Sequence, residues 1–178
     1  MKIVGLDISL TSTGLVVLED GVMIFNKAIK SKNEGKTVEE RLNRISEIID
    51  ELKANIHNKN IDVIVIEGYS FGSRVGMAYT IGELGGIARW EFRGYKMFEI
   101  APTQLKKFIT GKGKCDKNLI LKEVYKRYNV DFDSDDIADA FALAMIYWTL
   151  HCIENNIECK LTKPQKEVIG LMRKEGNK

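Results

Sequence analysis

The segment that most constrains the fold is a run of apolar, mostly β-branched residues near the middle of the chain. This run is Asp62-Val63-Ile64-Val65-Ile66, and it ends at Glu67-Gly68. An uninterrupted run of this kind is typical of a strand that is buried on both faces beside parallel neighbours. Parallel strands need crossover connections, which are usually helices. The run therefore predicts an α/β fold in which helices cover a central sheet.

Three short strands are predicted before this run, at Lys2 to Ile8, Thr13 to Glu19 and Val22 to Ile29. The first turn between them, Ser9 to Gly14, is rich in hydroxyl residues. The second, Glu19-Asp20-Gly21, has a glycine where a hairpin needs positive φ. Strands joined by such short turns pair antiparallel, so this part of the chain is expected to form a meander.

Helical spacing of apolar residues predicts most of the remaining elements. Helices are expected from Thr37 for about 18 residues, over Met77 to Phe92, after Ala101-Pro102-Thr103, from Asp116 to Tyr128, and from Ser134 onward, with a fifth strand at Lys96 to Ile100. The order predicts a mixed five-stranded sheet, made of an antiparallel meander of three strands plus two parallel strands, flanked by helices.

A chain of 178 residues fits one domain with a tail. We assign residues 1–150 to that domain and residues 151–178 to a polar C-terminal extension, which contains Pro164 and a weakly amphipathic stretch from Val168 to Met172.

Three cysteines without CxxC spacing argue against a disulfide framework or a zinc site, so a reducing cytoplasm is expected. The start of the chain lacks the pattern of a secretory signal. We see no stretch of about 20 apolar residues, so no membrane partner is expected. The formal net charge of +2 points to no particular partner.

Four acids are candidates for a shared site. Asp7 and Glu67 end two of the predicted strands, where ligands bind in open α/β sheets. Asp136 and Asp139 lie three residues apart at the start of the last long helix, so their side chains project from one side of it. Each acid alone has an ordinary explanation, either as an exposed strand end or as a favourable charge in the first turn of a helix.

Together, four such carboxylates would repel each other strongly unless cations held them. Oxygen ligands suit Mg²⁺, with Mn²⁺ as a substitute, and the lack of His or Cys nearby disfavours zinc. Two ions per site would activate water and stabilise the leaving oxygen in phosphodiester hydrolysis. We therefore assign Asp7, Glu67, Asp136 and Asp139 both as metal ligands and as catalytic residues.

The motifs that carry these acids resemble those of the RuvC family of Holliday junction resolvases, which have a ribonuclease H-like fold. They are Gly5-Leu6-Asp7, Ile66-Glu67 and Asp136-Ile-Ala-Asp139-Ala-Phe-Ala-Leu-Ala, joined by the basic stretch Thr110 to Lys117. The resemblance covers about Met1 to Leu150. The stretch after Glu67 and the tail depart from the pattern, as in the phage-encoded branch of the family.

The resemblance implies a metal-dependent endonuclease that acts as a homodimer on Holliday junctions and other branched DNA, including flaps and replication forks, in a bacterial cytoplasm. It implies 5′-phosphate and 3′-hydroxyl ends, matches the four acids to the family's catalytic tetrad, and places the dimer interface on the helix after the fourth strand.

Local charge also favours a nucleic acid partner. Between Lys96 and Val130, nine basic residues stand against three acids, and such lysines bind phosphates without regard to sequence. Part of this stretch is equally explained as a solvated helix face. Candidate DNA contacts, including two aromatic residues for stacking on unpaired bases, are Tyr69, Phe71, Arg74, Lys106, Lys107, Lys112, Lys114 and Lys117.

Three other functions stay open at this point. A YqgF-like ribonuclease acting on structured RNA would share the fold and the acids. An actin-like or sugar-kinase-like phosphotransferase would share the hairpin Gly5 to Gly14, although a single copy of the fold has no second phosphate loop. A junction-binding protein without catalysis is the third, and the complete set of four acids argues against it.

Overall fold

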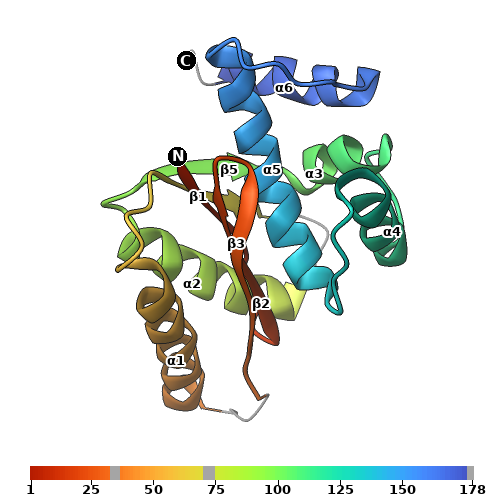
Figure 1. Cartoon of the computed structure of the whole chain (residues 1–178). Helices are drawn as coiled ribbons and strands as arrows, with labels where there is room; N and C mark the ends of the chain where they lie inside the picture. The colour runs from red at the N-terminus through yellow and green to blue at the C-terminus, as the bar shows by residue number, and fades with distance from the viewer. Residues whose placement is uncertain (33–36, 70–74, 176–178) are drawn as a thin grey trace.

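The computed structural model describes residues 1–32, 37–69 and 75–175, except for the side chains at 75–78, 117, 174 and 175. Among these residues, five strands form one sheet in the order β3-β2-β1-β4-β5 (Figure 1). The antiparallel part contains β1 (Lys2–Asp7), β2 (Ser12–Glu19) and β3 (Val22–Lys30). The parallel part adds β4 (Val63–Glu67) beside β1, then β5 (Lys96–Ile100). The predicted mixed sheet is confirmed.

Helices cover both faces of the sheet (Figure 1). One face packs against α1 (Val38–Ile56) and α2 (Val75–Glu91), and the buried residues of this side form one apolar cluster. The other face packs against α5 (Asp135–Glu154), which carries α3 (Pro102–Thr110), α4 (Lys117–Tyr128) and α6 (Lys163–Glu175) around it. The sheet therefore separates two apolar cores.

The start of α1 shows how local chemistry sets a helix boundary. The Thr37 side chain accepts a hydrogen bond from the backbone N–H of Glu40 at 3.2 Å, and the Glu40 carboxylate accepts one from the N–H of Thr37 at 2.9 Å. This reciprocal pair satisfies two backbone donors that the first turn leaves without partners. Ile45, Ile48 and Leu52 then recur at helical spacing and are buried against the sheet.

Two strand glycines let α5 lie directly on the sheet. A Cβ atom on Gly5 would stand 1.9 Å from the carbonyl oxygen of Ala140, and one on Gly14 would stand 2.0 Å from that of Asp136. Any side chain at these positions would push the helix off the strands. The backbone contact places the first turns of α5 at the end of β1, which is what positions the site described below.

Helix α5 also has the length and apolar composition of a membrane-crossing helix, in contrast to the expectation that the chain has no such stretch. Of its apolar window, 67% is buried inside the structure. A helix packed on all sides needs apolar residues around its whole circumference, and the central helix of a core meets the same criterion of length and hydropathy.

The expected C-terminal extension contains a helix that packs into the core. Helix α5 continues to Glu154, and α6 buries Val168, Ile169 and Met172 in the same cluster as the sheet-facing side of α5. It packs mainly on α3. The apolar stripe of α6 is short and surrounded by charged residues, which is why the sequence pattern there is weak. The proposed domain boundary at residue 150 stays a prediction.

Candidate active site

Two acids of the site stand side by side at the end of the sheet. Strands β1 and β4 are parallel neighbours, and Leu6 pairs with Ile66. The next residue on each strand is the acid, so Asp7 and Glu67 leave the sheet at the same edge. Both are half-buried. This edge is the carboxyl end of the parallel strands, where open α/β sheets bind ligands.

The other two acids reach the same edge on α5. Asp7 of β1 pairs with Gly14 of β2. Because Gly14 has no side chain, the carbonyl of Asp136 can lie directly against it. The Ser134 hydroxyl donates a hydrogen bond to the Asp136 carboxylate at 3.2 Å. Asp139 follows one turn later, so the close backbone contact of α5 with the sheet brings its acids toward the carboxyl end of β1.

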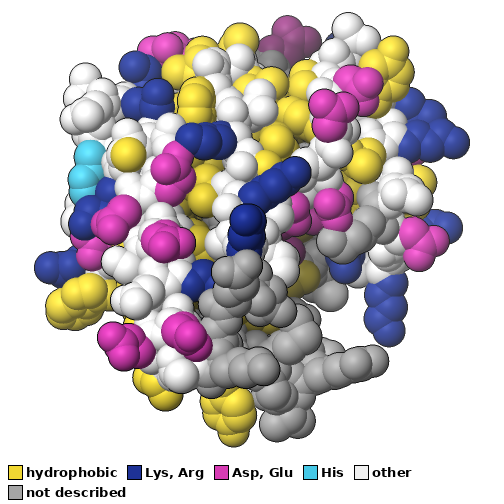
Figure 2. Space-filling model, turned by 90° about the horizontal axis from the view of Figure 1, so that it is seen from below, with side chains coloured by type: hydrophobic (Ala, Val, Ile, Leu, Met, Phe, Trp, Pro, Cys, Tyr) yellow, Lys and Arg dark blue, Asp and Glu magenta, His cyan; other side chains and the backbone are white. Residues whose placement is uncertain are grey.

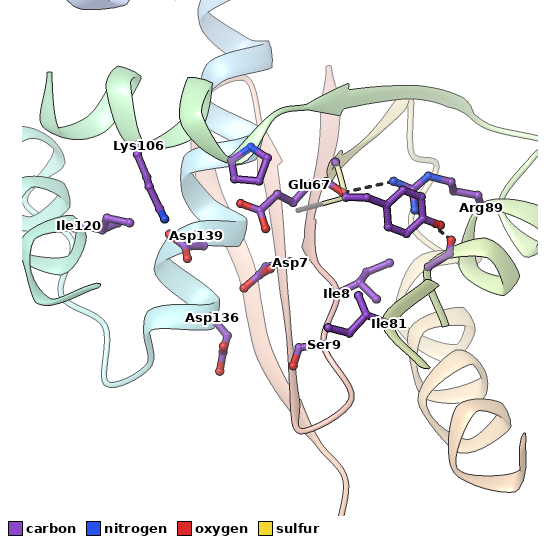
Figure 3. A pocket seen from close by; sticks show the side chains of 14 residues that line it. Asp7, Ile8, Ser9, Glu67, Ile81, Arg89, Lys106, Ile120, Asp136 and Asp139 are labelled. Atoms are coloured by element: carbon purple, nitrogen blue, oxygen red, sulfur yellow. Dashed lines mark hydrogen bonds between the residues drawn. The ribbon is translucent and has the colours of Figure 1, made fainter. Parts of the chain in front are cut away.

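All four acids line one cavity of about 330 Å³. Figure 3 shows the side chains of Asp7, Glu67 and Asp139 around a common space, with Asp136 lower and directed away from the other three. Within the described parts of the chain, no group of three His, Cys, Asp or Glu side chains is gathered closely enough to hold a metal ion. The acids thus share a cavity without forming a closed cluster.

The chemistry of these donors fits a hard divalent cation. Among the described residues that line the cavity, the charged oxygen ligands are all carboxylates, and neither His nor Cys is present. Carboxylate oxygens suit Mg²⁺ or Mn²⁺ far better than zinc, which takes nitrogen and sulfur ligands. The four acids outnumber the two basic residues of the lining, Arg89 and Lys106, so the cavity carries a net negative charge that attracts a cation.

The predicted DNA-binding residues fall into four groups. Lys106 and Tyr69 line the cavity, and Figure 3 shows Lys106 reaching from α3 toward Asp139. Lys112 and Lys114 are exposed in the loop after α3, whereas Lys107 forms an ion pair with Glu167 of α6 at 2.7 Å. The structure does not describe Phe71, Arg74 or the side chain of Lys117, so these three predictions lie outside the described residues.

Basic side chains on this side of the molecule are interspersed with acidic ones. Figure 2, which views the molecule from below, shows Lys and Arg standing among Asp and Glu rather than as one continuous basic surface. The described residues do not form a uniformly basic surface in this view. Phosphate binding here would therefore depend on a few well-placed lysines.

Comparison with known proteins identifies the family. The family model described as crossover junction endodeoxyribonuclease RuvC matches residues 3–147. This chain belongs to the RuvC family. Curated relatives of that description include one from Caldicellulosiruptor saccharolyticus, 30% identical over 83% of this chain and 92% of the relative, and one from Ehrlichia canis, 31% identical over 83% and 96%. RuvC family members depend on divalent metal ions, which agrees with the carboxylate-lined cavity.

Solved structures share the RuvC fold. The Thermus thermophilus RuvC structure superposes with a TM-score of 0.66 at 20% identity, covering 88% of this chain and 98% of that one. A structure of T. thermophilus RuvC in complex with a Holliday junction gives the same score over 82% of this chain and 91% of that chain. The yeast mitochondrial Holliday junction resolvase follows at 0.55. These likenesses confirm the predicted ribonuclease H-like arrangement.

Sequence reasoning misses a cavity-lining residue of this RuvC-family chain, Arg89 of α2. Its side chain is 24% exposed and donates hydrogen bonds to the carbonyl of Glu67 and to the carboxylate of Glu99. A Cβ on Gly85 would meet the side chains of Tyr69 and Arg89, whereas a Cβ on Gly82 would have nothing within 4 Å. The signal that could have found Arg89 is that it is the single basic residue in the sequence of α2.

Proposed function

We propose that this chain is a divalent-metal-dependent endonuclease that hydrolyses phosphodiester bonds at four-way junctions and other branched DNA. The observation that carries the proposal is the arrangement of Asp7, Glu67, Asp136 and Asp139 around one cavity in a chain of the RuvC family. The relatives that share about 30% of its sequence are crossover junction endodeoxyribonucleases. The expected products carry 5′-phosphate and 3′-hydroxyl ends.

These four acids would hold the metal. We expect two Mg²⁺ ions per site, and Mn²⁺ could take their place. Bound there, the ions would lower the pKa of water and stabilise the charge of the leaving oxygen. Asp7 and Glu67 sit on neighbouring strands of the rigid sheet, whereas Asp136 and Asp139 come from α5. A site built from a sheet edge and a core helix holds its ligands in a constant geometry.

Lysine side chains would hold the DNA backbone at this cavity. Lys106 lines the same cavity as the four acids, where its ammonium group could neutralise a phosphate that approaches the carboxylates. Lys112 and Lys114 extend the contact along the loop after α3. Lys107 is engaged with Glu167, so it would contact phosphate only by giving up that ion pair.

A homodimer would present two such cavities to the two symmetric strands of a junction. Helix α2 supports this proposal because Tyr79 and Trp90 are 75% and 67% exposed on it. Gly82 and Gly86, on the same helix, have open space beside them. Large exposed aromatic residues beside small ones are suited to a self-complementary contact between two copies. We place the action of this dimer in the cytoplasm of a bacterial cell, where DNA is accessible.

The test is an endonuclease assay with Mg²⁺ on four-way DNA, flap DNA, linear duplex and structured RNA. We expect cleavage of the branched DNA, and we expect Asp7→Asn or Glu67→Gln to lower its rate by about 10²-fold or more while junction binding stays equal or becomes stronger. Asp133→Asn is the matched control, since Asp133 is exposed just ahead of α5.

Three outcomes would contradict the proposal. Undiminished cleavage by the Asp7 or Glu67 variant would refute their role as metal ligands. Preferential cleavage of structured RNA would favour a YqgF-like ribonuclease. Stabilisation by ATP without cleavage of any nucleic acid would favour a phosphotransferase.

A further inference from the structure

The guanidinium group of Arg89 joins three separate parts of the chain at the wall of the cavity. Its Nε and Nη2 atoms donate to one carboxylate oxygen of Glu99 at 3.2 and 2.6 Å. Nη1 donates to the carbonyl of Gly85 at 3.1 Å, and Nη2 also donates to the carbonyl of Glu67 at 3.3 Å (Figure 3). Arg89 thus connects α2 and β5 to Glu67, the last residue of β4 and one of the four proposed catalytic acids.

The same guanidinium group also supports an aromatic ring. Its central carbon lies 4.3 Å from the ring centroid of Tyr69, which is within the range of a cation–π contact. The Tyr69 hydroxyl donates to the carbonyl of Gly82 at 3.5 Å. Tyr69 nevertheless stays 41% exposed on the wall of the cavity. Tyr69 is therefore held at two points and still accessible to a ligand.

Two glycines make room for this arrangement. A Cβ on Gly85 would stand 2.9 Å from the Tyr69 side chain and 3.0 Å from Nη1 of Arg89, and a Cβ on Gly68 would stand 3.0 Å from Glu99. A side chain at either position would have to displace the ends of these side chains, so the two glycines leave the space that Tyr69, Arg89 and Glu99 occupy.

We propose that Arg89 is a positioning residue that holds Tyr69 as a flat platform on which an unpaired base at a DNA branch point stacks. The planar guanidinium makes this possible, because it can form hydrogen bonds in its own plane to Glu99 and the two carbonyls while its face carries the ring. Every base has a π-face, so such a platform recognises unpaired bases without regard to sequence.

This role depends on the proposed function, since it needs branched DNA at the cavity. A duplex keeps its bases stacked on each other, so the platform would contribute to junctions and not to linear duplex. Arg89 would then determine selectivity for branched DNA, whereas the lysines of the loop after α3 would contribute to both.

The test uses proteins that also carry Asp7→Asn, so that the junction is not cut, and four-way junctions with 2-aminopurine at the branch point. Fluorescence of the bound junction reports stacking of that base. We expect Arg89→Lys to lose the quenching seen with the parent protein, as Tyr69→Ala does, and to raise the Kd for the junction by roughly threefold to tenfold. The Kd for duplex should stay unchanged.

Arg93→Lys is the matched control. Arg93 makes the same kind of contact with Trp90, at 4.2 Å, but lies just beyond the end of α2 and does not line the cavity. It should retain quenching and junction affinity, and Tyr69→Phe should do so as well because it keeps the ring.

Full quenching with Arg89→Lys, or equal losses of affinity for junction and duplex, would overturn the role of Arg89. No effect of Tyr69→Ala would overturn the platform itself. Neither result would affect the proposed function, which fails separately if the Asp7→Asn protein still cuts DNA.

Discussion

Replacing Gly14 with alanine tests whether the backbone contact between β2 and α5 positions the acids proposed to be catalytic. The added Cβ would stand 2.0 Å from the carbonyl oxygen and 2.5 Å from the carbonyl carbon of Asp136. An ordinary contact begins at 3.4 Å, so the first turn of α5 and the strand must separate by about 1.4 Å. The neighbour is backbone, so no flexible side chain can move to absorb the change.

This displacement should affect catalysis more than folding. Misplacing a catalytic group by about 1 Å can cost 10²-fold in rate, so we expect the single-turnover cleavage rate to fall by about 10²-fold. Overpacking a core typically costs about 1–3 kcal/mol, which for a chain of this length lowers the melting temperature by roughly 3–10 °C. Junction affinity should change little, because the lysines and Tyr69 lie on other elements.

The assay is single-turnover cleavage of a four-way junction with saturating enzyme and Mg²⁺, with melting temperatures measured by calorimetry. Gly170→Ala serves as the control, since a Cβ there meets nothing within 4 Å. It should cleave at the normal rate and be no less stable, because alanine favours a helix. A folded Gly14→Ala protein that cleaves at the normal rate would refute the argument that close contact at Gly14 positions Asp136.

Three further predictions concern other parts of the molecule. Replacing Lys112 and Lys114 with Gln should weaken binding to all DNA sequences and reduce the slope of log Kd against log salt by about 1 for each phosphate that the loop no longer binds; an unchanged slope would show that the loop does not bind phosphates. Trp90→Glu should convert the proposed dimer to a monomer in light scattering, whereas a monomeric parent protein would rule out this interface. Burial raises the pKa of Tyr128 to about 12. The unfolded chain therefore loses this proton near pH 10 while the folded chain keeps it, so stability is complete below pH 10 and falls by about 1.4 kcal/mol per pH unit toward pH 12. Urea unfolding of the parent protein and of Tyr128→Phe should show that the variant lacks this part of the loss; parallel curves would contradict it.

The arrangement of strands could be predicted because each strand is encoded by neighbouring residues. The run from Val63 to Ile66 indicates a strand buried on both faces, and the turns at Ser9 to Gly14 and around Gly21 indicate a meander. Once β1 and β4 are parallel neighbours, their last residues must share an edge. The positions of Asp7 and Glu67 therefore follow from local patterns together with one rule of sheet geometry.

The pattern of α6 is too weak to predict its packing. Its three buried residues gain their burial mainly against α3, which is distant in sequence, and also against α5, so the short apolar stripe alone does not indicate which helix it packs on. Lys107 is a similar case. Its ion pair with Glu167 joins residues 60 positions apart, and a lysine next to Lys106 in the sequence differs from it only in the tertiary structure.

The sequence by itself determined the sheet, the two acids at its carboxyl edge and the helix that carries Asp136 and Asp139. Only the tertiary structure decided how closely that helix approaches, through Gly5 and Gly14, and which residues hold the wall of the cavity, through Arg89. The physical reason is the range of the interactions. Hydrophobic period and turn chemistry act between neighbouring residues, whereas a close backbone contact or a guanidinium group with three acceptors depends on segments that meet only after folding.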